Sequence, residues 1–144
     1  MRLSRSVHLT LVTLVILAGG LIVGACGSTD SDTTIRVNED EWSLKPDAVT
    51  TAVGAVVFKV VNMGKDEHEL VVLRTSLSPN ELKMQVDQDK VDEEASGERV
   101  GEIEDVGPGE TKTATFELTA GRYVLLCNIP GHFTSGMVAA LEVK

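Results

Sequence analysis

Basic residues are scarce in this 144-residue chain, which holds 13 Lys and Arg against 22 Asp and Glu and carries a formal net charge of −9 at pH 7. Proteins that bind nucleic acid need clusters of Lys and Arg, because these side chains neutralise the phosphates. The charge balance therefore argues against a nucleic-acid partner. It is compatible with a basic protein partner, although many acidic proteins are merely soluble.

Cysteine is equally scarce, since the chain contains only Cys26 and Cys127. If Cys26 is modified, as its surroundings suggest below, Cys127 is the only thiol left in an oxidising compartment. A thiol without a partner there is expected to be reactive or metal-bound. The alternative is a disulfide between the two cysteines, which requires the first residue of a tethered domain to reach a core strand.

The amino terminus has the features of a secretory signal peptide over residues 1–25. Arg2 and Arg5 precede the apolar run LTLVTLVILAGGLIVGAC, and small residues stand before Cys26. The sequence VGAC resembles the bacterial lipobox, whose cysteine receives lipid and becomes the first residue of the mature protein. We therefore expect an extracytoplasmic lipoprotein anchored to the cell membrane at Cys26. An uncleaved transmembrane anchor is the alternative, because about 18 apolar residues can span a bilayer.

Downstream of a small, polar and acidic segment at 26–34, which is expected to be a flexible tether, residues 35–144 are expected to form one domain. The apolar residues there alternate with period two, as Val56, Phe58 and Val60 do on one face. About seven to eight strands with glycines at the turns predict an all-β Greek-key β-sandwich. The main strands are expected at 34–37, 41–45, 55–62, 68–75, 111–118, 121–127 and 136–144.

Residues 76–105 interrupt this pattern, because they are acidic and poor in β-branched residues. The sequence SPNE at 78–81 has the form of a capping box with proline at N1, so a short helix is expected near 79–84. The charged stretch 87–105 is expected to be a solvated surface excursion between strands. The alternative is an insertion that covers a site or docks a partner.

The stretch CNIPGHFTSGM, residues 127–137, places Cys127, His132 and Met137 at intervals of five. In a sandwich, the loop that contains them can meet the turn before His68 at one end of the sheets. Two imidazoles, one thiolate and a weak axial thioether form the ligand set of a blue-copper electron-transfer site. Copper(I) favours soft sulfur, while imidazole binds both oxidation states.

Other chemistries remain open for the same residues. A cysteine nucleophile needs a base, which His68 or His132 offers, but this leaves the spacing of Met137 without a role. Zinc accepts Cys and His but seldom a thioether, so copper fits better. Met63 is a rival sulfur, although a methionine five residues before His68 is more typical of turn packing.

The sequence resembles the cupredoxins, which are small type 1 (blue) copper proteins. Its Cys-x4-His-x4-Met loop is similar to that of rusticyanin-like and related bacterial cupredoxins. The pattern N-x-G-x3-H at 62–68 resembles the segment that carries the family's first histidine ligand, and residues 101–132 resemble lipid-anchored bacterial cupredoxins. The likeness extends from about Ile35 to the end of the chain.

The resemblance implies one type 1 copper ion with His68, Cys127 and His132 as equatorial ligands and Met137 as the axial ligand. The exposed edge of His132 is the electron port in similar proteins, and the residues 131–137 around it are the expected docking patch.

The resemblance also implies that Asn62, Glu69 and Asn128 lie beside the ligands. Family members often have Asn or Ser where this chain has Glu69, so the surroundings of the copper and its potential are expected to differ.

The function implied is that of a one-electron carrier, not an enzyme, which cycles Cu(I)/Cu(II) between membrane-associated redox proteins. Three histidines in the whole chain leave no donors for a second centre that would activate oxygen. Copper binding and delivery without electron transfer is the alternative, but such proteins more often use Met- or His-rich clusters, which this sequence lacks. No feature requires a dimer, and we expect a monomer.

Overall fold

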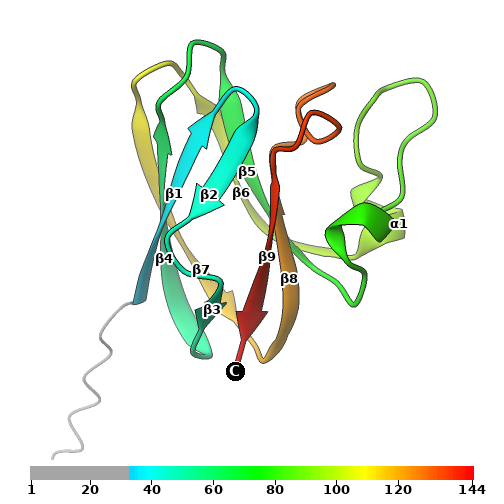
Figure 1. Ribbon diagram of the computed structural model, residues 1–144. Helices are drawn as coiled ribbons and strands as arrows, with labels where there is room; N and C mark the ends of the chain where they lie inside the picture. Colours follow the sequence, from blue (N-terminus) through cyan, green and yellow to red (C-terminus); the bar gives the residue numbers. More distant parts are fainter. Residues whose placement is uncertain (1–32) are drawn as a thin grey trace, which may run out of the picture. The chain divides into compact units, whose positions relative to one another are not determined.

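A computed structural model describes residues 33–144, so the predicted signal peptide 1–25, the lipidation of Cys26 and most of the tether 26–34 lie outside the described residues. Within 33–144, nine strands form two sheets, which confirms the predicted all-β sandwich (Figure 1). The strands are β1 (Thr33–Asp40), β2 (Ser43–Pro46), β3 (Thr50–Thr51), β4 (Gly54–Asn62), β5 (His68–Arg74), β6 (Glu98–Val106), β7 (Thr111–Leu118), β8 (Gly121–Leu126) and β9 (Val138–Val143).

The two sheets have the strand orders β2-β1-β4-β7 and β3-β9-β8-β5-β6. In the first sheet β1 runs parallel to β4, and β4 pairs antiparallel with β7. In the second sheet β5 lies between β6 and β8 and is antiparallel to both. The register that pairs Val71 with Leu126 places the beginning of β5 beside the end of β8. Residues 68 and 127 therefore meet at one end of the sandwich.

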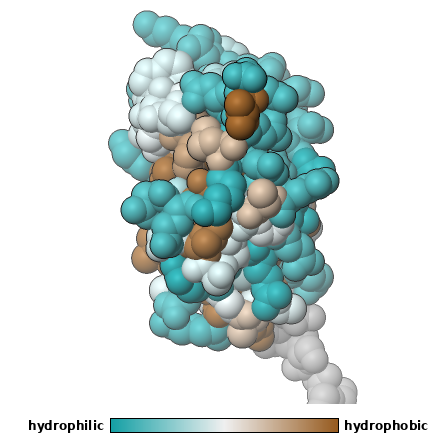
Figure 2. Space-filling model, turned by 90° about the vertical axis from the view of Figure 1, so that its right-hand side faces the viewer, coloured by the Kyte–Doolittle hydropathy of each residue, from teal (hydrophilic) through white to brown (hydrophobic). Residues whose placement is uncertain are grey.

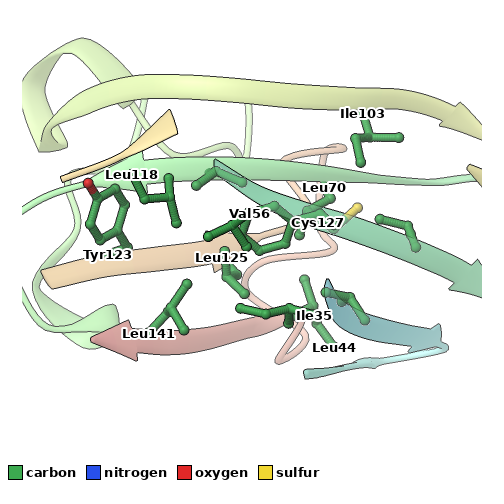
Figure 3. Packing of buried hydrophobic residues seen from close by; sticks show 14 of the residues in the cluster. Ile35, Leu44, Val56, Leu70, Ile103, Leu118, Tyr123, Leu125, Cys127 and Leu141 are labelled. Atoms are coloured by element: carbon green, nitrogen blue, oxygen red, sulfur yellow. The ribbon is translucent and has the colours of Figure 1, made fainter. Parts of the chain in front are cut away.

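The core lies between the sheets and follows the alternation expected from the sequence. Val56, Phe58 and Val60 of β4 are all buried, as predicted for one face of that strand. Figure 3 shows Cys127 among the aliphatic side chains of this core, toward the end opposite Tyr123. The thiol is thus part of the hydrophobic core rather than of the surface.

Two strands were not expected from the sequence, namely β3 and β6. The prediction that 87–105 is only a solvated charge run is wrong for its second half, which belongs to β6. In its sheet β6 is an edge strand, and only Ile103 and Val106 of its residues are buried. An edge strand with one half-exposed face needs few apolar residues, so its periodicity is weak. The two residues of β3 are too few to show any period.

The helix expected near 79–84 is a single 3-10 turn, η1 (Pro79–Glu81). Its start agrees with the prediction, because the N–H of Ser78 donates to the Glu81 carboxylate at 2.7 Å. A second short helix, α1 (Glu93–Ser96), was not predicted, since four residues cannot display a 3.6-residue period. Among residues 33–144, no helix has the length and apolar character needed to cross a membrane.

Glu39 is an exception to the apolar core. It follows Ile35 and Val37 on the inner face of β1, is completely buried, and neither of its carboxyl oxygens has a hydrogen-bond partner among the described residues. Burial, together with the nearby negative charge of Glu69, raises the pKa of Glu39 to about 8. The folded protein therefore keeps Glu39 protonated at neutral pH.

This burial predicts a pH-dependent stability for the metal-free protein. Between pH 4.5 and 8 the unfolded chain loses the Glu39 proton while the folded chain keeps it, so the free energy of unfolding should fall as the pH rises. Glu39→Gln removes the titrating group and should abolish this decrease in the free energy of unfolding. The variant should therefore be more stable than the wild type by a few kcal/mol at pH 8, with little difference at pH 5. Chemical denaturation at both pH values measures this, with the exposed Glu117→Gln as the control; equal effects at both would contradict it.

Candidate metal centre

The residues expected to bind metal lie in or beside the loops at one end of the sandwich, at the top in Figure 1. His68 is the first residue of β5, directly after the turn that leaves β4. Cys127 directly follows β8, and His132 and Met137 stand in the loop that leads to β9. The structure therefore brings together the two segments that the sequence analysis expected to meet.

Three donor atoms converge in this place. The Nδ1 atoms of His68 and His132 are 3.3 Å apart, and the Sγ of Cys127 is 3.3 Å from the Nδ1 of His132. One donor atom from each of the three residues lies within 4.8 Å of the others, and all three residues are buried. Two imidazole nitrogens and a sulfur that face one another away from water fit a metal ion with soft and borderline ligands.

The electrostatics of the site also fit a metal ion. Burial raises the pKa of the Cys127 thiol to about 12, so without a cation the thiol stays protonated. Burial, together with the neighbouring His68, lowers the pKa of His132 and favours the neutral imidazole that a metal requires. A buried thiol with a raised pKa is a poor nucleophile, which argues against a cysteine-dependent enzyme.

Met137 is fixed beside these donors through its backbone. Its N–H donates to the carbonyl of His132 at 3.1 Å, its carbonyl accepts from the N–H of Cys127 at 3.1 Å, and its side chain is completely buried. The rival Met63 is 63 % exposed. Burial thus favours Met137 over Met63 as a fourth donor, while its axial ligation stays a prediction.

Asn62 organises the turn that presents His68. Its amide donates to the carbonyls of Asp66 and Val106, at 2.7 Å each, and its side-chain oxygen accepts from the N–H of Gly64 at 2.8 Å. Asn62 is buried, and its bond to Val106 is shielded from water. The turn is therefore held at both ends before His68 enters β5.

Glu69 and Asn128 join the two segments that carry the donors. The carboxylate of Glu69, next to His68, accepts from the N–H of Asn128, next to Cys127, at 3.0 Å. Burial raises the pKa of Glu69, and the nearby Glu102 adds to this. The residue that departs from the family pattern thus holds the two donor segments together.

The acidic excursion, which comprises residues 75–97 between β5 and β6, is hydrogen-bonded to the loop that follows β8. The side chain of Asn128 accepts from the N–H of Val91 at 2.7 Å and donates to its carbonyl at 3.1 Å. The carbonyl of Asp89 accepts from the N–H of Gly131 at 3.0 Å. Figure 2 shows that the face on the excursion side is mostly hydrophilic, with scattered apolar side chains. The excursion therefore supports the donor loop from outside, in addition to connecting two strands.

Two residues of the β1–β2 turn belong to the site and were not expected there. Trp42 contacts His132 edge to face, with ring centroids 5.0 Å apart and planes at 71°. His132 is 8 % exposed and Trp42 is 46 % exposed, so the indole forms part of the surface beside the histidine, and the role of His132 as an electron port stays a prediction. The carboxylate of Glu41 lies 3.5 Å from the Nε2 of His68. No motif marks these residues, because their role depends on contacts with distant segments.

Solved structures of other proteins share this fold at low identity. An auracyanin from Roseiflexus castenholzii is 20 % identical with a TM-score of 0.56, over 78 % of this chain and 98 % of that chain. Auracyanin A from Chloroflexus aurantiacus is 19 % identical with a TM-score of 0.54, over 78 % and 99 %. An azurin from Methylomonas sp. strain J is 12 % identical with a TM-score of 0.52, over 78 % and 98 %. A comparison with curated proteins gives no sequence match.

A comparison with protein families is decisive for the metal. Residues 31–144 match the family described as copper binding proteins, plastocyanin/azurin family. The match spans the whole sandwich and includes His68, Cys127 and His132, whose donors converge as described above. Copper is therefore the cofactor of this site, and the chain belongs to the plastocyanin/azurin family of copper binding proteins.

Proposed function

We propose that this protein is a one-electron carrier that cycles a type 1 copper ion between Cu(I) and Cu(II). In this proposal His68, Cys127 and His132 are the equatorial ligands and Met137 is the weak axial ligand. The observation that carries the proposal is the convergence of three buried donor atoms within 4.8 Å of one another, in a chain of a copper-binding family. When bound, copper supplies the redox couple, and the residues of the chain supply its fixed surroundings.

The rigidity of the donor segments supports electron transfer. The bond between Glu69 and the backbone of Asn128 links the two segments directly, and Asn62 braces the turn before His68. Donors that move little between oxidation states keep the reorganisation small when an electron moves. Burial also excludes water, which would otherwise reorient around a changing charge.

Copper delivery is the weaker alternative. A delivery site has to release its ion to a partner, whereas His68, Cys127 and His132 are buried and the loop that holds two of them is braced by the excursion. The chain also lacks the Met- or His-rich clusters that copper-handling proteins more often use.

The setting of this carrier is part of the proposal. We infer that the protein acts outside the cytoplasm as a monomer, anchored to the membrane by lipid at Cys26. Its partners would be redox proteins with basic surfaces, since the chain carries a net charge of −9. One structural relative is named a "blue" copper protein of a photosynthetic bacterium, which accords with electron transfer as the general role.

The decisive experiment is a visible absorption spectrum of the purified full-length protein loaded with Cu(II). We expect an intense thiolate-to-copper band that ascorbate bleaches and an oxidant restores. Cys127→Ser should abolish the band, because it removes the thiolate, while a Ser substitution at the exposed Thr134 should leave it unchanged. A protein that binds copper without this band, or a Cys127→Ser variant that stays blue, would contradict the proposal.

A second test concerns Met137. Met137→Leu should retain copper and raise the reduction potential, because the loss of a weak sulfur donor disfavours Cu(II). The exposed Met63→Leu is the matched control and should leave the potential unchanged. Redox titration followed by absorbance measures both, and an unchanged or lowered potential in Met137→Leu would count against axial ligation.

The anchor can be tested separately. Cys26→Ala should release the domain from membranes, because the lipidated cysteine would be the only attachment of the mature chain. Fractionation of cells that produce each form measures the distribution of the protein. Continued tight membrane association of the variant would point to an uncleaved transmembrane segment instead.

A further inference from the structure

Glu41 reaches from the β1–β2 turn into the turn that precedes His68. Its Oε1 accepts from the N–H of Lys65 at 2.6 Å and from the N–H of Asp66 at 2.9 Å. The bond from Asp66, followed by the bond from Lys65, is the main cause that lowers the pKa of Glu41 to about 2. Two backbone N–H groups thus hold the carboxylate in place, although its side chain remains 23 % exposed.

Gly64 provides the space for this carboxylate. A Cβ at position 64 would overlap the carboxyl group of Glu41, so any other residue would displace it or the turn. The same glycine donates its N–H to Asn62, which fixes its position. The turn at 62–68 thus forms a cradle for an anion that comes from another loop.

The carboxylate lies against the outward nitrogen of His68. The Nε2 atom is buried and has no hydrogen-bond partner among the described residues at ordinary hydrogen-bond geometry, and the Oε1 of Glu41 lies 3.5 Å away. The other ring nitrogen, Nδ1, lies 3.3 Å from the Nδ1 of His132, on the side of the donor cluster. The two nitrogens of His68 therefore face two different environments, one toward an anion and one toward the metal position.

We propose that Glu41 is a positioning residue of the copper centre, which holds the proton of His68 on Nε2 and leaves Nδ1 free as the metal donor. A carboxylate accepts but cannot donate, so it selects the Nε2–H tautomer over the Nδ1–H tautomer. Such carboxylate–histidine–metal arrangements orient the ring and raise the basicity of the ligating nitrogen. This positioning role requires only that the site binds copper and does not depend on the proposed electron-carrier function.

A second consequence rests on the proposed electron-carrier function. The negative charge of Glu41 interacts with the copper ion more favourably in the Cu(II) state than in the Cu(I) state, because the oxidised ion carries one more positive charge. Glu41 therefore lowers the reduction potential. The charge is fixed by backbone bonds, so it acts on the centre at a constant distance in both states.

Substitutions separate the two effects. Glu41→Gln keeps an oxygen acceptor but removes the charge, so we expect the ratio of Cu(II) to Cu(I) affinities to fall roughly tenfold, a rise of about 59 mV in the one-electron potential. Glu67→Gln removes an exposed carboxylate from the same turn and is the matched control, with a much smaller shift expected. Gly64→Ala should displace the Glu41 carboxylate and raise the potential without changing any charged residue.

A measurement on the metal-free protein tests the tautomer without copper chemistry. Nitrogen NMR of His68 in its neutral form should show the proton on Nε2 in the wild type and in Glu41→Gln, and a mixture of tautomers in Glu41→Ala. A wild-type His68 protonated on Nδ1, or a tautomer unaffected in both Glu41→Ala and Gly64→Ala, would overturn the positioning role. If the wild-type protein binds copper without reversible redox cycling, the electron-carrier proposal fails, whereas this tautomer measurement still decides the role of Glu41.

Discussion

The convergence of three metal-binding atoms in a buried place is the constraint on which the rest of this structure depends. Polar atoms are costly to bury unless they interact, and the donors of His68, Cys127 and His132 meet this condition by facing one another in a place that a cation can share. They come from segments about sixty residues apart. The antiparallel pairing of β5 with β8 solves this problem, because it places the first residue of one strand beside the residue that follows the other. The sandwich therefore serves as a frame that sets the separation of the donors.

Loops extend from this end of the sandwich, and hydrogen bonds hold them in place. On one side, Asn62 fixes the turn before His68 from within. On the other side, Asn128 binds the backbone of Val91 in the excursion. Glu69 connects the two sides through the N–H of Asn128. A shift of either donor loop would therefore break buried or partly buried hydrogen bonds.

Features that depend on local pattern were predictable from the sequence, and features that depend on distant contacts were not. The alternation in β4 and the spacing of Cys127, His132 and Met137 are properties of short stretches, so the sandwich and the donor set could be inferred. The capping box at 78–81 predicted where η1 begins but not that it ends after one turn. The edge strand β6 could not be predicted, because its many charged residues obscure the alternation. It pairs with one strand only and buries little of its surface, so few of its side chains have to be apolar. The role of Glu41 could not be inferred, since it arises from bonds to a turn more than twenty residues away.

Two carboxyl groups in neighbouring positions show how this end of the molecule controls its charge. Glu39 points into the core without hydrogen-bond partners among residues 33–144, and burial raises its pKa to about 8, so it stays neutral. Glu41, two residues later, receives two backbone N–H groups that lower its pKa to about 2, so it stays charged. The same side chain thus has opposite charge states because only one position offers donors. The chain keeps the inner carboxyl neutral beneath the site and fixes one anion against the outward edge of His68, where its charge can act on the metal through that ring.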